Sequence, residues 1–185
     1  MHGHDLVVTK TIFMIKLKTA FFLLILLGLV SFAPSTIFHS FSDKEDNSNN
    51  LACNALKTEL AINKGQLVLI NFWASHNASS RIENIKFASL MNNYRYSKFE
   101  NAKGFVVISV SLDTYPSVFD ETVKRDGLSI TQNINATKGF DSKLAHNYKL
   151  GNEFGNLLLD AKGEVLAKNL SANELKELLK NKHTN

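Results

Sequence analysis

The stretch from Leu67 to Arg81, LVLINFWASHNASSR, most constrains the fold of this chain. Its first half, which ends at Phe72 and Trp73, is a run of β-branched and large apolar residues, too short for a helix and typical of a fully buried strand. A small polar segment, Ala74 to Ser80, follows, and a helical pattern begins near Arg81. We therefore expect a strand, a loop and a helix N-terminus at the carboxyl edge of a sheet, where α/β proteins usually keep their functional groups.

The N-terminal part of the sequence indicates export. Lys16 and Lys18 precede an uncharged apolar run, Ala20 to Ala33. This run of about 14 residues is shorter than the roughly 20 that span a bilayer and suits a signal-peptide core. Counting on to Phe38 brings it to spanning length, so residues 14–38 are either a cleaved signal peptide or a membrane anchor. The charges around the run favour a domain on the outer side of the membrane.

The remaining chain divides into a linker and one domain. Residues 1–13 are a mis-assigned start or an extension, because Met14 begins a more usual signal segment than Met1. Residues 39–54 are polar and without periodicity, which predicts a linker. Residues 55–185 are enough for one domain with its own core. The net charge of +4 comes from scattered lysines without a basic stripe, which argues against a nucleic-acid partner.

Hydrophobic periodicity predicts the other elements of the domain. The first helix is expected to have an apolar face at helical spacing, made of Ile82, Ile85, Phe87, Leu90, Met91 and Tyr94. Ser171 and Glu174 form a capping box that opens the last helix, whose inward face carries leucines. A turn at residues 160–163 predicts that the last two strands pair antiparallel. The expected ranges are helices at 80–99 and 141–148, a second buried strand at 105–112, a loop at 131–139, and strands at 157–160 and 164–167. A further helix is expected to start at residues 115–116 and to end at residues 125–127.

Two separated segments resemble landmarks of thioredoxin-like proteins, specifically the exported TlpA/ResA-like, AhpC/TSA-type thiol-disulfide oxidoreductases. The first landmark pattern is roughly FWASWCxPCRxE, and the matching residues are Phe72, Trp73, Ala74, Ser75, Arg81 and Glu83. The second is roughly YxVxGxPTxFLID, and Tyr148, Leu150 and the LLLD segment at 157–160 match it. The resemblance covers about residues 64–179. It implies an α/β fold: a three-layer sandwich with a central mixed sheet flanked by helices.

The reactive residues of the family are missing. Asn77 and Ser80 stand at the two cysteine positions. Disulfide exchange needs a thiolate and a second thiol, which an amide and a hydroxyl do not supply, so no catalytic residue is assigned. The family's cis-proline position holds Phe154, for which we expect a trans bond, because a cis bond before a non-proline residue costs about 3–4 kcal/mol.

Cys53 is the single cysteine, a free thiol that cannot form an internal disulfide. Three interpretations remain open: an incidental thiol near the linker, an intermolecular disulfide after export, and a lipid-modified cysteine.

His76 and Ser80 allow two interpretations, a hydrolytic Ser–His pair or purely structural roles. A pair of His76 and Ser80 would need an orienting group, for which Glu83 is near in sequence, and an oxyanion hole. The alternative is that His76 is an exposed loop residue, Ser80 caps the helix, and Arg81 and Glu83 are a solvated pair. The histidines are dispersed, so no metal and no cofactor are expected.

Three functions follow from these residues. The first is a binding module in the bacterial envelope, which holds a protein or peptide at a surface where exposed aromatic and small polar side chains gather. The second is a thioredoxin-family redox protein in redox homeostasis, acting through Cys53 or with a partner. The third is a drifting duplicate with little retained role. The domain would lie in the periplasm or on the outer membrane face, and would touch the membrane only through its N-terminal segment. The residues expected at the binding surface are Trp73, His76, Asn77 and Phe154.

Overall fold

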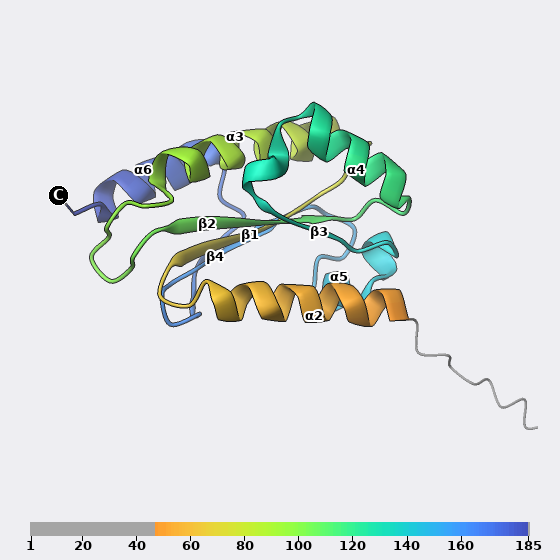
Figure 1. Ribbon diagram of the computed structural model, residues 1–185, viewed down its shortest axis with the longest axis horizontal. Helices are drawn as coiled ribbons and strands as arrows, with labels where there is room; N and C mark the ends of the chain where they lie inside the picture. The colour runs from red at the N-terminus through yellow and green to blue at the C-terminus, as the bar shows by residue number, and fades with distance from the viewer. Residues whose placement is uncertain (1–46, 185) are drawn as a thin grey trace, which may run out of the picture. The chain divides into compact units, whose positions relative to one another are not determined.

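A computed structural model describes residues 47–184, which form a five-stranded sheet with helices on both faces (Figure 1). The expected signal or anchor segment, residues 14–38, and residues 1–13 lie outside this range. The strands are β1 (Leu67–Trp73), β2 (Phe105–Ser111), β3 (Gln132–Asn135), β4 (Asn156–Leu159) and β5 (Val165–Lys168). The helices are α2 (Asn47–Ile62), α3 (Ala78–Tyr94), α4 (Pro116–Arg125), α5 (Lys143–Asn147) and α6 (Ala172–Lys182), with short turns η1 (Leu128–Ile130) and η2 (Gly139–Asp141).

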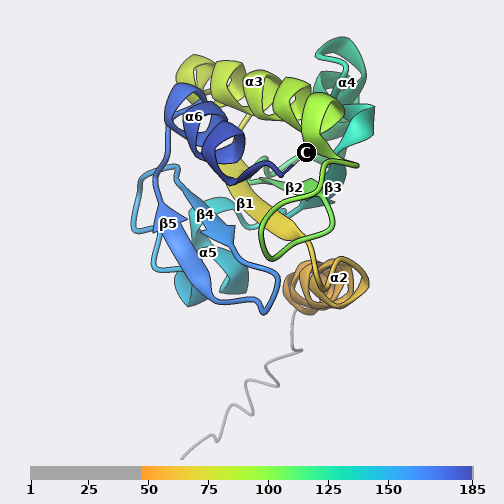
Figure 2. The same ribbon diagram turned by 90° about the vertical axis from the view of Figure 1, so that its left-hand side faces the viewer.

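The architecture has three layers. The strand order is β3-β2-β1-β4-β5, with β1, β2 and β3 parallel, and with β4 antiparallel to β1 and β5 antiparallel to β4. Helices α3, α4 and α6 cover one face of the sheet, and α2 and α5 cover the other. Figure 2 shows α3 and α6 side by side on their face. The predicted fold class, an α/β sandwich around a mixed sheet, is confirmed. Within residues 47–184 no helix is long and apolar enough to cross a membrane.

The two central strands position the site. Every residue of β1 and β2 is buried, as expected of strands covered on both faces. Trp73 is in register with Ser111, and Ser111 with Asn135, so the three parallel strands end together. The loops that follow them meet at one edge of the sheet, which is the edge that the sequence predicts for the functional groups.

The predicted linker is wrong for residues 47–54. These residues form the first half of α2, which continues to Ile62. Ala52 and Leu56, one helical turn apart, are buried in the main core. The three adjacent apolar residues of this polar segment, 51–53, give no helical periodicity in the sequence, and packing against the rest of the domain stabilises the helix instead.

The inward face of α3 agrees only in part with the prediction. Phe87, Leu90 and Met91 are buried as expected. Ile82 and Ile85 are instead 53% and 39% exposed, and Asn84 is buried. The helix is turned so that Asn84 faces the sheet, where its amide bonds to Asn71 and Ser109. A polar residue on the buried face cannot be recognised from apolar periodicity. The helix ends at Tyr94 rather than Phe99.

The sequence predicts a loop over residues 131–139. In the structure, residues 132–135 of this segment form β3. This strand lies at the edge of the sheet and buries only Ile134, so its sequence lacks the alternation that marks a strand. On α4, Val118 is exposed, whereas Phe119 and Val123 pack against the cluster that contains Leu128. The antiparallel pairing of β4 with β5 and the capping box at Ser171 and Glu174 are confirmed.

Candidate functional site

Asn77 caps the helix that begins at the site. Its side-chain oxygen accepts a hydrogen bond from the Ser80 N–H at 2.8 Å, and its carbonyl accepts one from Arg81 N–H at 3.1 Å. The expectation that Ser80 caps α3 is therefore wrong. The short amide side chain of Asn77 reaches the third residue of the helix, which is the geometry of a strong N-cap.

The Ser80 hydroxyl is also committed to the backbone. It accepts a hydrogen bond from Ala74 N–H at 3.3 Å and donates one to the Asn77 carbonyl at 3.1 Å. These bonds close the loop on itself across the start of the helix. The two residues at the family's cysteine positions thus both have a structural role in shaping this loop.

A buried carboxylate from the neighbouring strand end holds the other side of the loop. Asp113 accepts hydrogen bonds from the Ser75 N–H at 3.0 Å and from the Ser75 hydroxyl at 2.7 Å. Ser111 donates a third from its hydroxyl at 2.7 Å. Asp113 is only 4% exposed, and a buried carboxylate is tolerated because several donors surround it.

His76 lies on the outside of this loop. Its side chain is 72% exposed, and its Nδ1 is 3.8 Å from the Asp113 carboxylate. Its ring packs edge-on against the ring of Phe154, with centroids 6.3 Å apart, and Phe154 packs against Phe140 at 5.1 Å. His76 lies next to Asp113, and the Ser80 hydroxyl bonds to the backbone, so the geometry does not assemble a Ser–His pair.

Trp73 does not lie at the surface where it was expected. It is fully buried in a second cluster with Ala88 and Leu128, on the α3 side of the sheet. Its indole Nε1 has no hydrogen-bond partner among the described residues. Side chains alternate between the two faces along β1, and Trp73 points toward the layer of α3. It is buried there because β1 is covered on both faces.

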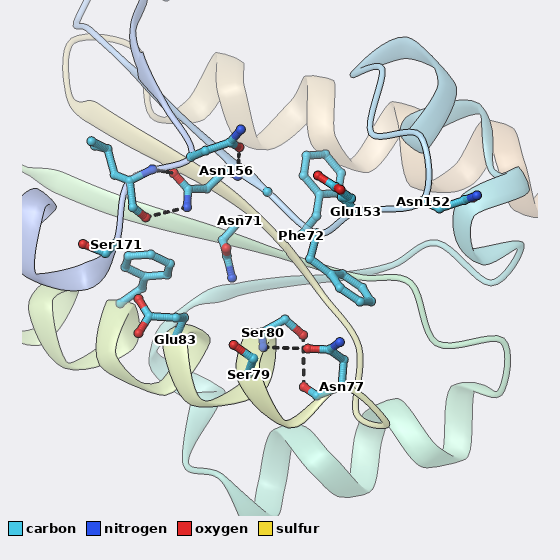
Figure 3. Close-up of a pocket in the computed structure, with 15 residues that line it drawn as sticks. Asn71, Phe72, Asn77, Ser79, Ser80, Glu83, Asn152, Glu153, Asn156 and Ser171 are labelled. Atoms are coloured by element: carbon cyan, nitrogen blue, oxygen red, sulfur yellow. Dashed lines mark hydrogen bonds between the residues drawn. The ribbon is translucent and has the colours of Figure 1, made fainter.

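A groove of about 550 Å³ opens beside Asn77 and Ser80 (Figure 3). One wall is the start of α3, the other is the loop from Asn152 to Asn156, and the segment from Asn169 to Ser171 closes the end. Asn77 and Phe154 line it, whereas His76 lies at its edge through its contact with Phe154. The groove is lined by Asn71, Phe72, Asn77, Ser79, Ser80, Glu83, Phe87, Asn152, Glu153, Phe154, Gly155, Asn156, Asn169, Leu170 and Ser171.

The wall opposite α3 is stiffened by amides. Asn156 exchanges two hydrogen bonds with the Leu170 backbone, at 2.8 and 3.0 Å. A β-carbon at Gly155 would lie 2.5 Å from the Asn169 Oδ1, so this side chain lies directly against the glycine. No cis peptide bond occurs in residues 47–184, and the bond before Phe154 is trans.

The sequence predicts a solvated pair of Arg81 and Glu83, and this prediction is wrong. Arg81 forms a two-pronged ion pair with Asp126, whose pKa is lowered chiefly by the hydrogen bond from Arg81. Glu83 accepts hydrogen bonds from Ala172 N–H, the first residue of α6, at 2.8 Å and from Lys86 at 2.7 Å. Burial alone would raise the pKa of Glu83, but these two bonds bring it below its ordinary value.

Cys53 is half-buried on α2, on the face of the sheet opposite α3 (Figure 1). Burial, and to a smaller extent the Cys53 thiol, raise the pKa of Tyr148. Both side chains pack against the main core. The thiol is therefore part of the α2 packing and not of the groove. Among the described residues no three His, Cys, Asp or Glu side chains form a group that could hold a metal.

Asn71, Asp113, Asn156 and Asn169 are site residues that the sequence analysis did not single out. Asp113 directly follows a predicted strand, and that position alone places it at the carboxyl edge of the sheet. Asn71 and Asn156 lie on β1 and β4, and Asn169 directly follows β5. No motif or spacing connects these three asparagines in the sequence.

The structure resembles solved thioredoxin-like proteins. A thioredoxin-like protein from Parabacteroides distasonis has 33% identity and a TM-score of 0.54, over 63% of this chain and 81% of that one. A thiol-disulfide oxidoreductase from Bacteroides fragilis has 27% identity and a TM-score of 0.55, over 64% and 82% of the two chains. A thiol:disulfide interchange protein from a Bacteroides species, at 20% identity and a TM-score of 0.56, over 66% and 76%, shares the fold. No protein-family profile and no curated protein matches the chain.

Proposed function

This chain belongs to the thioredoxin-like family of thiol-disulfide oxidoreductases, and we propose that it is an exported member that binds a protein or peptide of the bacterial envelope without exchanging disulfides. The observation that carries the proposal is the state of the loop before α3. Asn77 and Ser80 occupy the positions of the family's two cysteines, and both are engaged in hydrogen bonds that shape the loop. Neither side chain can act as a thiolate nucleophile or resolve a mixed disulfide.

The groove beside this loop supports a binding role. It combines amide and hydroxyl groups with the rings of Phe87 and Phe154. A concave site with apolar walls and a few placed polar groups is the usual form of a ligand site in proteins. An extended peptide could place backbone groups against the amides and a side chain against the rings.

Export is supported by the apolar run that follows Lys16 and Lys18 and precedes the domain. The proposal holds for either a cleaved signal or an anchor, because both place the domain outside the cytoplasm.

The alternative is a redox role for Cys53. The position of this thiol on α2, on the sheet face opposite α3, weighs against it, because the thiol would have to leave the α2 packing to reach the groove. A single thiol would also still need a second thiol from a partner.

Insulin disulfide reduction by the full-length chain tests the loss of redox chemistry, with Cys53→Ser alongside. We expect no turnover above background in either protein. Turnover in the unaltered chain that Cys53→Ser abolishes would assign the chemistry to the lone thiol and overturn the proposal.

Peptide titration followed by NMR tests the binding role. We expect a set of extended peptides to shift the signals of groove residues, and Phe154→Ala to weaken this binding. Tyr96→Ala, an exposed aromatic residue outside the groove lining, is the matched control and should leave binding unchanged. Peptides that shift no groove signal would overturn the binding role.

A further inference from the structure

Asn71 on β1 presents a hydrogen-bond acceptor at the floor of the groove. Asn71 is only 4% exposed, and Figure 3 shows its side chain lying between β1 and α3. Its Nδ2 donates to Asn84 Oδ1 at 2.9 Å, and Asn84 in turn donates to Ser109 at 2.9 Å. The Ser109 hydroxyl also donates to Asn84 Oδ1, at 3.1 Å. In this arrangement the Asn71 Oδ1 has no hydrogen-bond partner among residues 47–184.

An unpartnered acceptor at this depth places a demand on any ligand. When a ligand fills the groove and displaces water, the Asn71 oxygen loses its solvent bonds, which costs free energy unless the ligand donates in return. The group that reaches the floor of the groove must therefore carry N–H or O–H donors.

Glu83 contributes a carboxylate acceptor to the groove lining. Its carboxylate already accepts bonds from Ala172 N–H and Lys86. A carboxylate offers about four lone-pair positions, so two bonds leave capacity for a donor that enters the groove. The Asn71 amide on β1 and the Glu83 carboxylate on α3 both line the groove.

The charges of the lining favour a cation. Glu83 and Glu153 are the charged residues among those that line the groove, and both are acidic. Lys86 offsets part of the charge on Glu83, whereas Glu153 is exposed and has no ion-pair partner among the described residues. An acidic ligand side chain would meet two carboxylates here, and a basic one would be attracted.

We infer that the groove receives an arginine side chain from an extended peptide, with the guanidinium group donating to Asn71 Oδ1 and to the Glu83 carboxylate. The guanidinium group presents five N–H donors in a planar fork and can meet two separate acceptors at once, whereas the ammonium group of lysine is a compact point charge. The aliphatic stem of the arginine packs against Phe154, as long basic side chains do on apolar surfaces. This inference rests on the proposed binding function and names its ligand class.

The test compares two small probes with the full-length, ¹⁵N-labelled chain: N-acetyl-arginine methylamide and its citrulline counterpart. Citrulline has nearly the shape of arginine but no charge. We expect the arginine probe to shift the Asn71 side-chain amide signals and to bind at least about fivefold more tightly than the citrulline probe. Equal affinities of the two probes would overturn the inference.

Two variants locate the site. Glu153→Gln should lower the affinity for the arginine probe about two- to threefold and leave the affinity for the citrulline probe unchanged. Glu164→Gln, on the exposed turn before β5, is the control and should change neither affinity. Asn71→Ser should reduce binding of the arginine probe more than that of the citrulline probe. Because this variant also removes a partner of Asn84, its melting temperature is measured alongside, and an equal loss for both probes in a folded protein would contradict the inference.

The result also separates this inference from the proposed function. If neutral extended peptides shift the groove signals and the two probes bind equally, the binding function holds and the arginine preference is wrong. If no peptide and neither probe shifts a groove signal, the proposed function fails as well.

Discussion

The Asp113 carboxylate holds Ser75 by both its N–H, at 3.0 Å, and its hydroxyl, at 2.7 Å. Asp113 follows β2 and Ser75 follows β1, so this contact ties together the loops after the two central strands. The Asn77 cap fixes the other end of the same loop. The loop beside the groove is therefore held at both ends by side chains.

Asp113→Asn should lower the free energy of unfolding by about 1–3 kcal/mol, because the amide replaces one acceptor oxygen by a donor facing the donors of Ser75. Urea denaturation measures the change. Asp120→Asn, on the exposed face of α4, is the control and should lie within about 0.5 kcal/mol of the unaltered protein. Equal stabilities of the two variants would show that the Asp113 contact does not hold the loop.

Asn77→Ala should lower the free energy of unfolding by about 0.5–2 kcal/mol, because it removes the cap of α3. Asn77→Asp retains an acceptor and should lower it less. Thermal unfolding followed by circular dichroism measures both. Asn92→Ala, an exposed position within the same helix, is the matched control and should be neutral or slightly stabilising. A cost at Asn92 as large as that at Asn77 would count against the capping role.

The ion pair between Arg81 and Asp126 should make stability depend on pH. The pKa of Asp126 is lowered chiefly by the Arg81 hydrogen bond, so its stabilisation is complete above the ordinary aspartate pKa of about 3.9 and is lost as the pH falls through the lowered value. Arg81→Gln should therefore cost about 1–3 kcal/mol at neutral pH and progressively less below about pH 4. Urea denaturation over a pH series checks this, with Lys124→Gln, an exposed α4 residue, as control. A cost that does not change with pH would contradict the ionic origin.

Restoring the two cysteines should restore disulfide chemistry. The double variant Asn77→Cys with Ser80→Cys places thiols at the start of α3, where the helix dipole and free N–H groups lower a cysteine pKa. We expect insulin reduction at least about tenfold above that of the unaltered chain, and none from Asn77→Cys alone, which lacks a resolving thiol. A folded double variant without turnover would mean that more of the catalytic frame is lost than the two thiols.

The sequence by itself determined the elements with strong local signals. The apolar run of β1, the helix opened by Ser171 and Glu174, and the turn between β4 and β5 all lie where their residues predicted. The loss of both cysteines is likewise visible in the sequence alone. These features depend on neighbouring residues, so short-range rules suffice for them.

Only the tertiary structure decided which side chains line the groove. The sequence placed Trp73 at the surface, but the two-sided cover of β1 buries it, and the rotation of α3 brings Asn84 rather than Ile82 onto the sheet. Asn71 and Asn156 face each other because β1 and β4 pair antiparallel, although 85 residues of sequence separate them. Burial and hydrogen bonding depend on which distant segments pack together, and no local pattern records that.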